Sequence, residues 1–149
     1  MIREITESDY QQLMELYTHL HEKSVPSFEG RAAEYWHRIN SDPDYHIIVA
    51  EVDGRLVSSC SCIIIPNMTH QAKPYAFVEN VVTHADYRNR GLASACLKTA
   101  KEIAEQNSCY KIFLLTGSKL ESTLNFYERA GYERNTKTAF YMPLNTDGE

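Results

Sequence analysis

The 149-residue sequence has little cysteine and no long apolar run. Its four cysteines, Cys60, Cys62, Cys96 and Cys109, are fewer than small secreted domains usually need for a disulfide framework. No apolar stretch approaches the roughly 20 residues of a membrane helix, and residues 1–5 lack the apolar core of a signal peptide. These absences predict a cytoplasmic protein with reduced thiols and no membrane partner.

Basic residues are not in excess either. Lys and Arg number 15 against 20 Asp and Glu, which gives a net charge of −5. A general nucleic-acid binder would usually be basic, so no nucleic-acid partner is expected. Cys60 and Cys62 lie two apart in an apolar run, and no second Cys/His pair stands at metal-ligand spacing. We therefore expect both thiols to be buried and no metal site.

The chain instead carries a mixed helix and strand pattern without repeat or linker. Its length suits one domain over residues 1–149, in which 145–149 form a polar tail. Hydrophobic periodicity and turn residues predict helices over 10–20, 29–40, 91–106 and 120–130, and strands over 2–6, 45–52, 55–65, 75–83, 111–116 and 138–144. The expected fold class is α/β: a mixed central sheet with an antiparallel N-terminal meander, flanked by about four helices.

The most informative stretch lies between the strand over 75–83 and the helix over 91–106. It has the form Arg-x-x-Gly-x-Ala, and it includes Arg88, Arg90 and Gly91. A helix N-terminus exposes unpaired N–H groups that suit an anion, and glycine lets the backbone come close to a ligand. The arginines add charge that can pair with phosphate oxygens. Walker A and Rossmann loops are absent. Alone, the pattern fits either a phosphate loop or a turn with two solvated arginines.

Together with a second stretch, this loop resembles the GNAT superfamily of N-acetyltransferases. Residues 88–93 match the family's motif A, Gln/Arg-x-x-Gly-x-Gly/Ala. Residues 125–132, with the sequence Asn-Phe-Tyr-Glu-Arg-Ala-Gly-Tyr, resemble its motif B. The order of the expected elements fits the family over nearly the whole chain. The resemblance implies a GNAT-like single domain that uses acetyl-CoA as co-substrate and needs no metal.

The resemblance also implies how acetyl-CoA binds. Backbone N–H groups of the loop would hold the pyrophosphate, and the preceding strand would contact the pantetheine arm. The matching positions are Arg88, Asn89, Arg90, Gly91, Leu92, Ala93 and Ser94 in the loop, and Val81, Val82 and Thr83 in the strand. A main-chain N–H near Val82 would polarise the thioester carbonyl. The family often places a CoA-contacting Asn where this chain has Ser118 and Lys119, which puts that contact in doubt.

Two residues are the expected catalytic groups. Tyr127 matches the tyrosine that often serves the family as general acid toward the departing CoA thiolate; the alternative is a core aromatic. A phenol, with a pKa near ~10, can donate a proton to a thiolate, whose conjugate acid has a pKa near ~8.5. Glu79 shares a face with Val81 if the strand is regular, and it could take a proton from an ammonium substrate. A structural role for Glu79, and His84 or water as the base, remain alternatives.

The predicted function is transfer of an acetyl group from acetyl-CoA to a primary amine of a small molecule, by direct attack in a ternary complex. Residues 79–82 look like those of family members that acetylate glucosamine phosphate, which favours a small amine or amino sugar. A protein N-terminus or lysine is the alternative acceptor, and a non-catalytic acyl-CoA sensor is the alternative class. The final strand, with Phe140 and Tyr141, could pair across an edge to form a homodimer.

Overall fold

The computed structural model describes residues 1–22 and 24–144, so the predicted polar tail over 145–149 lies outside the described residues. The chain divides into two compact units, Met1–Leu114 and Leu115–Glu149. Each unit has its own internal contacts. The expectation of one domain over residues 1–149 stays a prediction.

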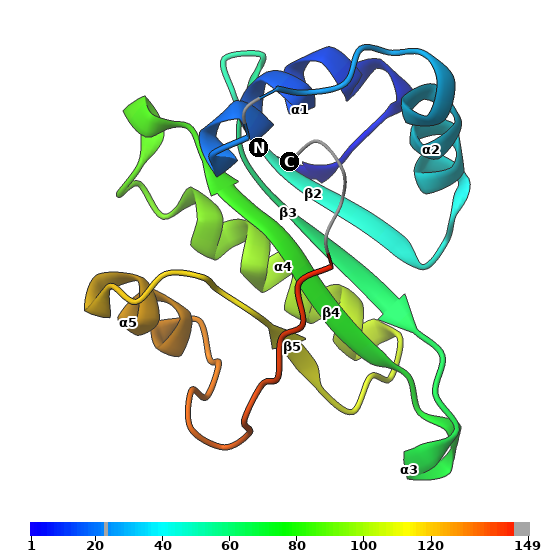
Figure 1. Ribbon diagram of the computed structural model, residues 1–149, viewed down its shortest axis with the longest axis vertical. Helices are drawn as coiled ribbons and strands as arrows, with labels where there is room; N and C mark the ends of the chain where they lie inside the picture. The colour runs from blue at the N-terminus through cyan, green and yellow to red at the C-terminus, as the bar shows by residue number, and fades with distance from the viewer. Residues whose placement is uncertain (23, 145–149) are drawn as a thin grey trace. The chain divides into compact units, whose positions relative to one another are not determined.

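A five-stranded sheet forms the centre of the first unit, in the order β1-β2-β3-β4-β5 (Figure 1). Its strands are β1 Ile2–Glu4, β2 Tyr45–Val52, β3 Arg55–Ile65, β4 Tyr75–Thr83 and β5 Ile112–Leu114. The first four strands pair antiparallel, and β5 pairs parallel to β4. This arrangement confirms the predicted mixed sheet with its antiparallel meander.

The bounds of β2, β3 and β4 are those predicted. β2 and β3 are joined by Asp53 and Gly54, whose φ angles are +50° and +77°. A two-residue hairpin turn with both central φ angles positive matches the twist of the flanking strands, which is why Asp-Gly is a strong hairpin signal.

Helices cover both faces of this sheet. The helical segments of this unit are η1 Glu7–Asp9, α1 Tyr10–Tyr17, η2 Thr18–Leu20, α2 Gly30–Ser41, the short turn α3 Thr69–Ala72, η3 Ala85–Tyr87 and α4 Leu92–Gln106. On one face, α1 and α2 enclose a core that includes Leu13, Trp36 and Val49. On the other face, α4 packs so that Cys62 Sγ lies 3.8 Å from the carbonyl oxygen of Ala100. These sides are called the α1 face and the α4 face.

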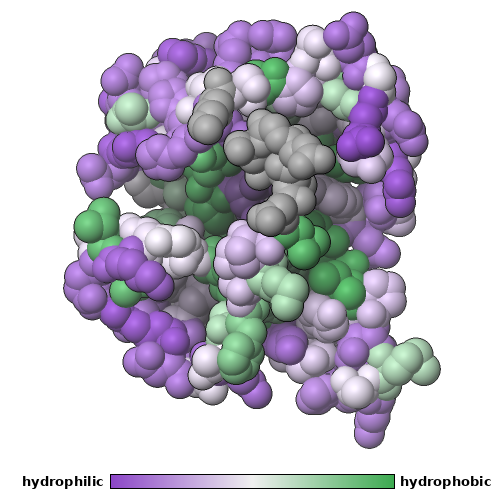
Figure 2. Space-filling view, in the orientation of Figure 1, coloured by the Kyte–Doolittle hydropathy of each residue, from purple (hydrophilic) through white to green (hydrophobic). Residues whose placement is uncertain are grey.

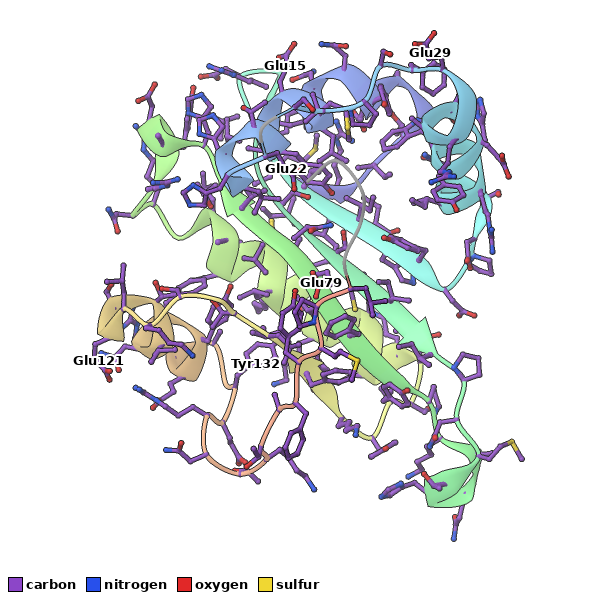
Figure 3. The ribbon with its side chains drawn as sticks, in the orientation of Figure 1. Glu15, Glu22, Glu29, Glu79, Glu121 and Tyr132 are labelled. Atoms are coloured by element: carbon purple, nitrogen blue, oxygen red, sulfur yellow. The ribbon has the colours of Figure 1, made fainter. Side chains whose placement is uncertain are left out.

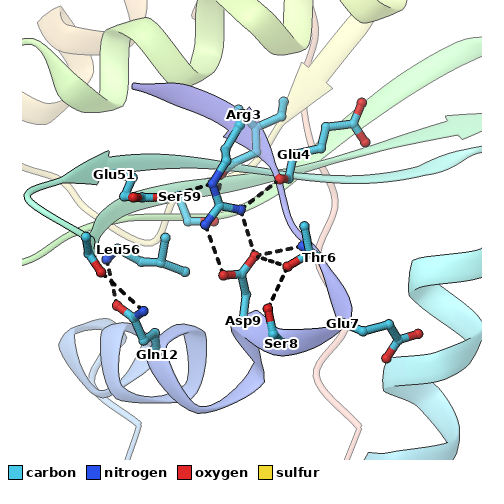
Figure 4. A network of polar contacts seen from close by, with 12 residues as sticks. Arg3, Glu4, Thr6, Glu7, Ser8, Asp9, Gln12, Glu51, Leu56 and Ser59 are labelled. Carbon is cyan, nitrogen blue, oxygen red and sulfur yellow. Dashed lines mark hydrogen bonds and ion pairs between the residues drawn. The ribbon is translucent and has the colours of Figure 1, made fainter.

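A polar network joins β1 to the start of α1 (Figure 4). Arg3 donates two hydrogen bonds to the carboxylate of Asp9, at 2.7 and 3.0 Å, and one to Glu51 at 2.9 Å. Asp9 also accepts a hydrogen bond from the Thr6 N–H at 2.7 Å. Asp9 is only 5% exposed, so the guanidinium supplies the partners that its buried charge requires.

The second unit contains α5, Glu121–Arg129, and the chain leaves this helix through Gly131, which has a φ of +103°. The strand predicted over 138–144 is wrong, because the structure assigns no strand there. Phe140 and Tyr141 are 94% and 80% exposed. A short apolar run does not show the alternation that distinguishes a strand. It also needs a partner strand, and no strand of the described residues pairs with 138–144. The homodimer stays a prediction.

The exposed surface is mostly hydrophilic in the space-filling view, with separate hydrophobic areas (Figure 2). The large hydrophobic side chains that are exposed include Phe28, Tyr35, Met68, Phe140, Tyr141, Met142 and Leu144. Single exposed apolar residues are ordinary on a folded protein, whereas a contiguous run such as 140–144 is less common.

Candidate active site

The centre of the candidate site is a β-bulge in β4. Pairing between β3 and β4 shifts between Ser59 and Ser61, so that Asn80 and Val81 together oppose a single residue of β3. Asn80 has a φ of +52°, a left-handed conformation that asparagine adopts more readily than most residues. Bulges bend a strand, redirect its side chains and are common beside active sites.

The bulge changes which side chains share a face. Val78 pairs with Cys62 on the α4 face, whereas Val82 belongs to the core on the α1 face. In a regular strand these two residues, four apart, would lie on the same side. Glu79 therefore lies on the α1 face and Val81 on the α4 face, so the expectation that they share a face is wrong.

A group of polar side chains gathers on the α1 face beside the bulge, where Glu79 stands on β4 (Figure 3). Burial raises the pKa of Tyr17 to about 12, and the neighbours of its hydroxyl include Ser61 and Asn80. Burial also raises the pKa of Tyr45, and the neighbouring Glu79 carboxylate raises it further. Both phenols therefore stay protonated at neutral pH, and they provide hydrogen-bond donors beside a carboxylate.

Sequence patterns place Tyr17 and Tyr45 on apolar stripes and do not indicate their role at this site. Their rings are largely buried, as the hydrophobic periodicity predicts, but that periodicity does not indicate which groups the hydroxyl contacts. Asn80 is the one local signal, because an asparagine inside an apolar strand is compatible with a bulge. The polar group itself depends on the pairing of β3 with β4 and on α1 lying over both.

The backbone of β4 beyond the bulge is the predicted pantetheine contact. Of the described residues, β5 pairs with β4 only along Ala76–Val78, so the edge from Glu79 to Thr83 has no strand beside it on that side. The predicted residues Val81, Val82 and Thr83 lie on this edge. The Val82 side chain is buried in the core, so only its backbone is available to a ligand.

The loop after β4 has the geometry of an anion site. Asn89 and Gly91 have φ angles of +62° and +74°, two left-handed residues two positions apart. Such turns direct backbone N–H groups into a concavity that suits an anion. Gly91 is the N-cap of α4, and since it has no side chain it leaves the N–H groups of the first turn to a ligand. These features suit an anion, and the binding of a pyrophosphate by residues 88–94 stays a prediction.

The two arginines of this loop are held in different ways. Arg88 Nε donates to the Thr83 carbonyl oxygen at 3.3 Å, at the end of β4. Arg90 donates to the Asp86 carbonyl oxygen at 3.0 Å, and its guanidinium lies 4.9 Å from the centre of the Tyr87 ring. Both side chains are exposed, so their charge faces the solvent at the start of α4.

Tyr127 lies in α5 of the second unit, and its ring is half-buried. Edge-on contacts join it to Phe126 at 5.0 Å and to Tyr132 at 6.3 Å between ring centres. The Tyr132 N–H also donates to the Tyr127 carbonyl oxygen at 3.0 Å. The residues of the predicted motif B thus position this ring. Ser118 accepts a hydrogen bond from the Leu120 N–H at 3.2 Å, just before the helix.

Among residues 1–22 and 24–144, no group of three or more His, Cys, Asp or Glu side chains could hold a metal ion. No helix in this part of the chain is long and apolar enough to cross a membrane. The four cysteines are free, and three of them, Cys60, Cys62 and Cys96, are buried. Burial raises the pKa of these three thiols, which disfavours the thiolate that a cysteine nucleophile requires.

Comparisons with known proteins bear on the family and the overall fold. A family model described as the Acetyltransferase (GNAT) family matches residues 10–132. A glucosamine 6-phosphate N-acetyltransferase from Trypanosoma brucei brucei is 29% identical over 136 residues, 91% of this chain and 90% of that protein. The structure of a putative acetyltransferase from Agrobacterium tumefaciens str. C58 is 34% identical, with a TM-score of 0.86 over 97% of this chain and 99% of that one. The structure of a glucosamine-6-phosphate N-acetyltransferase from Arabidopsis thaliana is 22% identical, with a TM-score of 0.83 over 99% of this chain and 98% of that one. This likeness supports the fold alone.

Proposed function

We propose, from the premise that this chain belongs to the acetyltransferase (GNAT) family, that its acceptor is the primary amine of a small molecule. As a GNAT-type enzyme it is an acetyl-CoA-dependent acetyltransferase. The observation that carries the proposal is the carboxylate of Glu79 on the α1 face of the bulge, with the Tyr45 phenol beside it and Tyr17 next to Tyr45. A carboxylate and hydrogen-bond donors together suit an ammonium group that also carries hydroxyls.

An amino sugar phosphate is the acceptor class that we favour within this proposal. The Trypanosoma relative, which matches nearly its full length, is named for glucosamine 6-phosphate. A protein N-terminus or lysine is the second candidate acceptor. A half-buried polar group such as that of Tyr17, Ser61 and Asn80 favours a compact polar substrate, since a peptide needs an open groove.

The chain's own groups divide the work of the reaction. Acetyl-CoA, when bound, supplies the thioester that the amine attacks. Residues 88–94 would bind its pyrophosphate, and backbone groups at Val81–Thr83 would orient the pantetheine arm and polarise the carbonyl. Glu79 would accept the amine's proton, directly or through water, and Tyr127 would donate a proton to the departing sulfur. His84 fits the role of base less well, because Arg55 and the Asp86 N–H already face its two ring nitrogens.

Acetyl transfer to a panel of amines tests the proposed function. The panel contains glucosamine 6-phosphate, glucosamine, a diamine and a lysine peptide, with CoA release as the readout. We expect the amino sugars to exceed the peptide by about tenfold or more in kcat/KM. Faster transfer to the peptide would favour the protein acceptor. Stabilisation by acetyl-CoA without transfer to any amine would favour an acyl-CoA sensor.

We also propose a cytoplasmic location, with which the four free cysteines are consistent.

Glu79→Gln is expected to lower kcat about 100-fold, because glutamine cannot accept a proton. Steady-state kinetics with the best amine of the panel checks this. Glu105→Gln, at an exposed position of α4, is the matched control and should keep the wild-type kcat. A rise in KM at unchanged kcat would show that Glu79 orients the amine without taking its proton.

A further inference from the structure

Basic side chains from three separate segments meet where β4 ends. The His19 ring of η2 and the His84 ring lie 4.3 Å apart between their centres. Arg55 Nη2, at the start of β3, lies 3.0 Å from His84 Nε2. Arg88, from the loop after β4, donates to the neighbouring Thr83 carbonyl oxygen. The contacts of His19 and Arg55 do not follow from the motif that identifies the loop, since both residues are far from it in the sequence.

The hydrogen atoms around His84 leave two donors facing each other. His84 Nδ1 accepts a hydrogen bond from the Asp86 N–H at 3.1 Å, so the proton of the neutral ring is on Nε2. Arg55 Nη2, a group that can only donate, faces this Nε2–H at 3.0 Å. If the ring proton were on Nδ1, this Nδ1–H would instead face the Asp86 N–H, which is also a donor. In either tautomer two donors face each other, and an anionic oxygen that accepts a hydrogen bond from both would relieve this unfavourable contact.

Electrostatics indicates the same kind of ligand. Burial, followed by the nearby His84 and Arg88, lowers the pKa of His19. Arg55 acts in the same direction, and Asp86 acts against it. Positive groups held this close repel one another, and a bound anion with two charges would turn that repulsion into attraction. A phosphomonoester, which carries a charge of −1.5 to −2 at neutral pH, has both the charge and the acceptor oxygens.

We propose that His19, Arg55 and His84 form a phosphomonoester subsite adjoining the pyrophosphate loop, with Arg88 between the two. The inference rests on the proposed function, because the phosphate is carried by one of the two substrates. The 3′-phosphate of CoA and the phosphate of an amino sugar present the same chemistry. The pyrophosphate loop binds with backbone N–H groups, whereas this subsite binds with guanidinium and imidazole groups.

Two preferences of the wild-type protein test the subsite, and calorimetry and steady-state kinetics measure them. The first is the ratio of the Kd of dephospho-CoA to that of CoA. The second is the ratio of the KM of glucosamine to that of glucosamine 6-phosphate. We expect one of the two ratios to be about tenfold or more, because losing hydrogen bonds to a charged group weakens binding by about that factor. The variant Arg55→Gln with His84→Gln should reduce that ratio to about twofold, and the ratio that falls identifies the source of the phosphate.

Two further variants separate charge from structure. Arg55→Lys keeps the charge and should keep most of the preference, while Arg31→Gln removes an exposed charge on α2 and should keep all of it. If both wild-type ratios are near one, or the double variant leaves both unchanged, the subsite is overturned and the proposed function stands. If neither CoA nor dephospho-CoA binds the wild-type protein, the proposed function fails, and the inference fails with it.

Discussion

Tyr127→Phe is expected to lower kcat by about 100-fold or more while KM for acetyl-CoA changes little. The hydroxyl is the group proposed to protonate the departing CoA thiolate, and without it the thiolate leaves without its proton donor. The ring contacts of Tyr127 with Phe126 and Tyr132 are aromatic, and phenylalanine retains them. Steady-state kinetics with saturating amine and varied acetyl-CoA measures the effect.

Tyr132→Phe is the matched control, because the Tyr132 ring contacts the Tyr127 ring and the substitution also removes only a hydroxyl. It should lose less than about threefold in kcat, as expected of a hydroxyl outside the chemistry. The two thermal midpoints, measured in parallel, report any loss of packing. Equal losses of kcat in the two variants would favour a structural role for this aromatic group over general acid catalysis by Tyr127.

The second large effect concerns stability. Arg3→Ala is expected to lower the free energy of unfolding by about 3 kcal/mol, since it leaves the buried Asp9 carboxylate without its cation. Arg3 is itself a quarter exposed, so water that enters the site keeps the loss at the lower end of the usual range. Urea unfolding at pH 7 measures it. Arg31→Ala, on the exposed surface of α2, should change stability by less than about 0.5 kcal/mol.

The same network gives the stability a dependence on acid. The hydrogen bonds from Arg3 hold the pKa of Asp9 below its ordinary value, although burial acts in the opposite direction. A carboxyl with a lowered folded-state pKa stabilises the protein above its unfolded pKa of ~3.9, and the stabilisation is lost as pH falls through the folded value. The part of the free energy of unfolding that acid removes by protonating Asp9 should therefore be absent in Arg3→Ala. Parallel stability curves for the two proteins between pH 5 and pH 2.5 would contradict this account.

Local signals predict most of the fold. β-branched runs and the Asp53–Gly54 turn define β2 and β3, and the loop before α4 is recognisable because glycine and a helix start each have a local physical meaning. The final strand over 138–144 could not be predicted correctly in this way. A strand requires a partner, and a run of apolar residues does not say whether one exists.

The candidate site was less predictable from sequence, for the same reason. Tyr127 comes from a matched motif and Glu79 from its place on the strand, but the faces of β4 depend on a bulge that only pairing with β3 reveals. Tyr45 reaches Glu79 from the second strand of the sheet. Arg55 and His84, 29 positions apart, meet because β3 and β4 run antiparallel. Which distant residues meet in this way is decided by the register of the strands, and the local sequence does not indicate it.

The bulge also bears on how such a protein can diversify. Because Glu79 lies on the α1 face and Val81 on the α4 face, neighbouring positions of one strand are exposed to different selective pressures. Under the proposed function, substitutions at Tyr17 or Tyr45 would alter the choice of acceptor while the loop that starts α4 keeps its sequence. The acceptor can then change without a change in the loop proposed to bind the acyl donor. Deletion of Asn80 would remove the extra residue of the bulge and restore regular alternation, with Glu79 and Val82 still on the α1 face and Val81 on the α4 face.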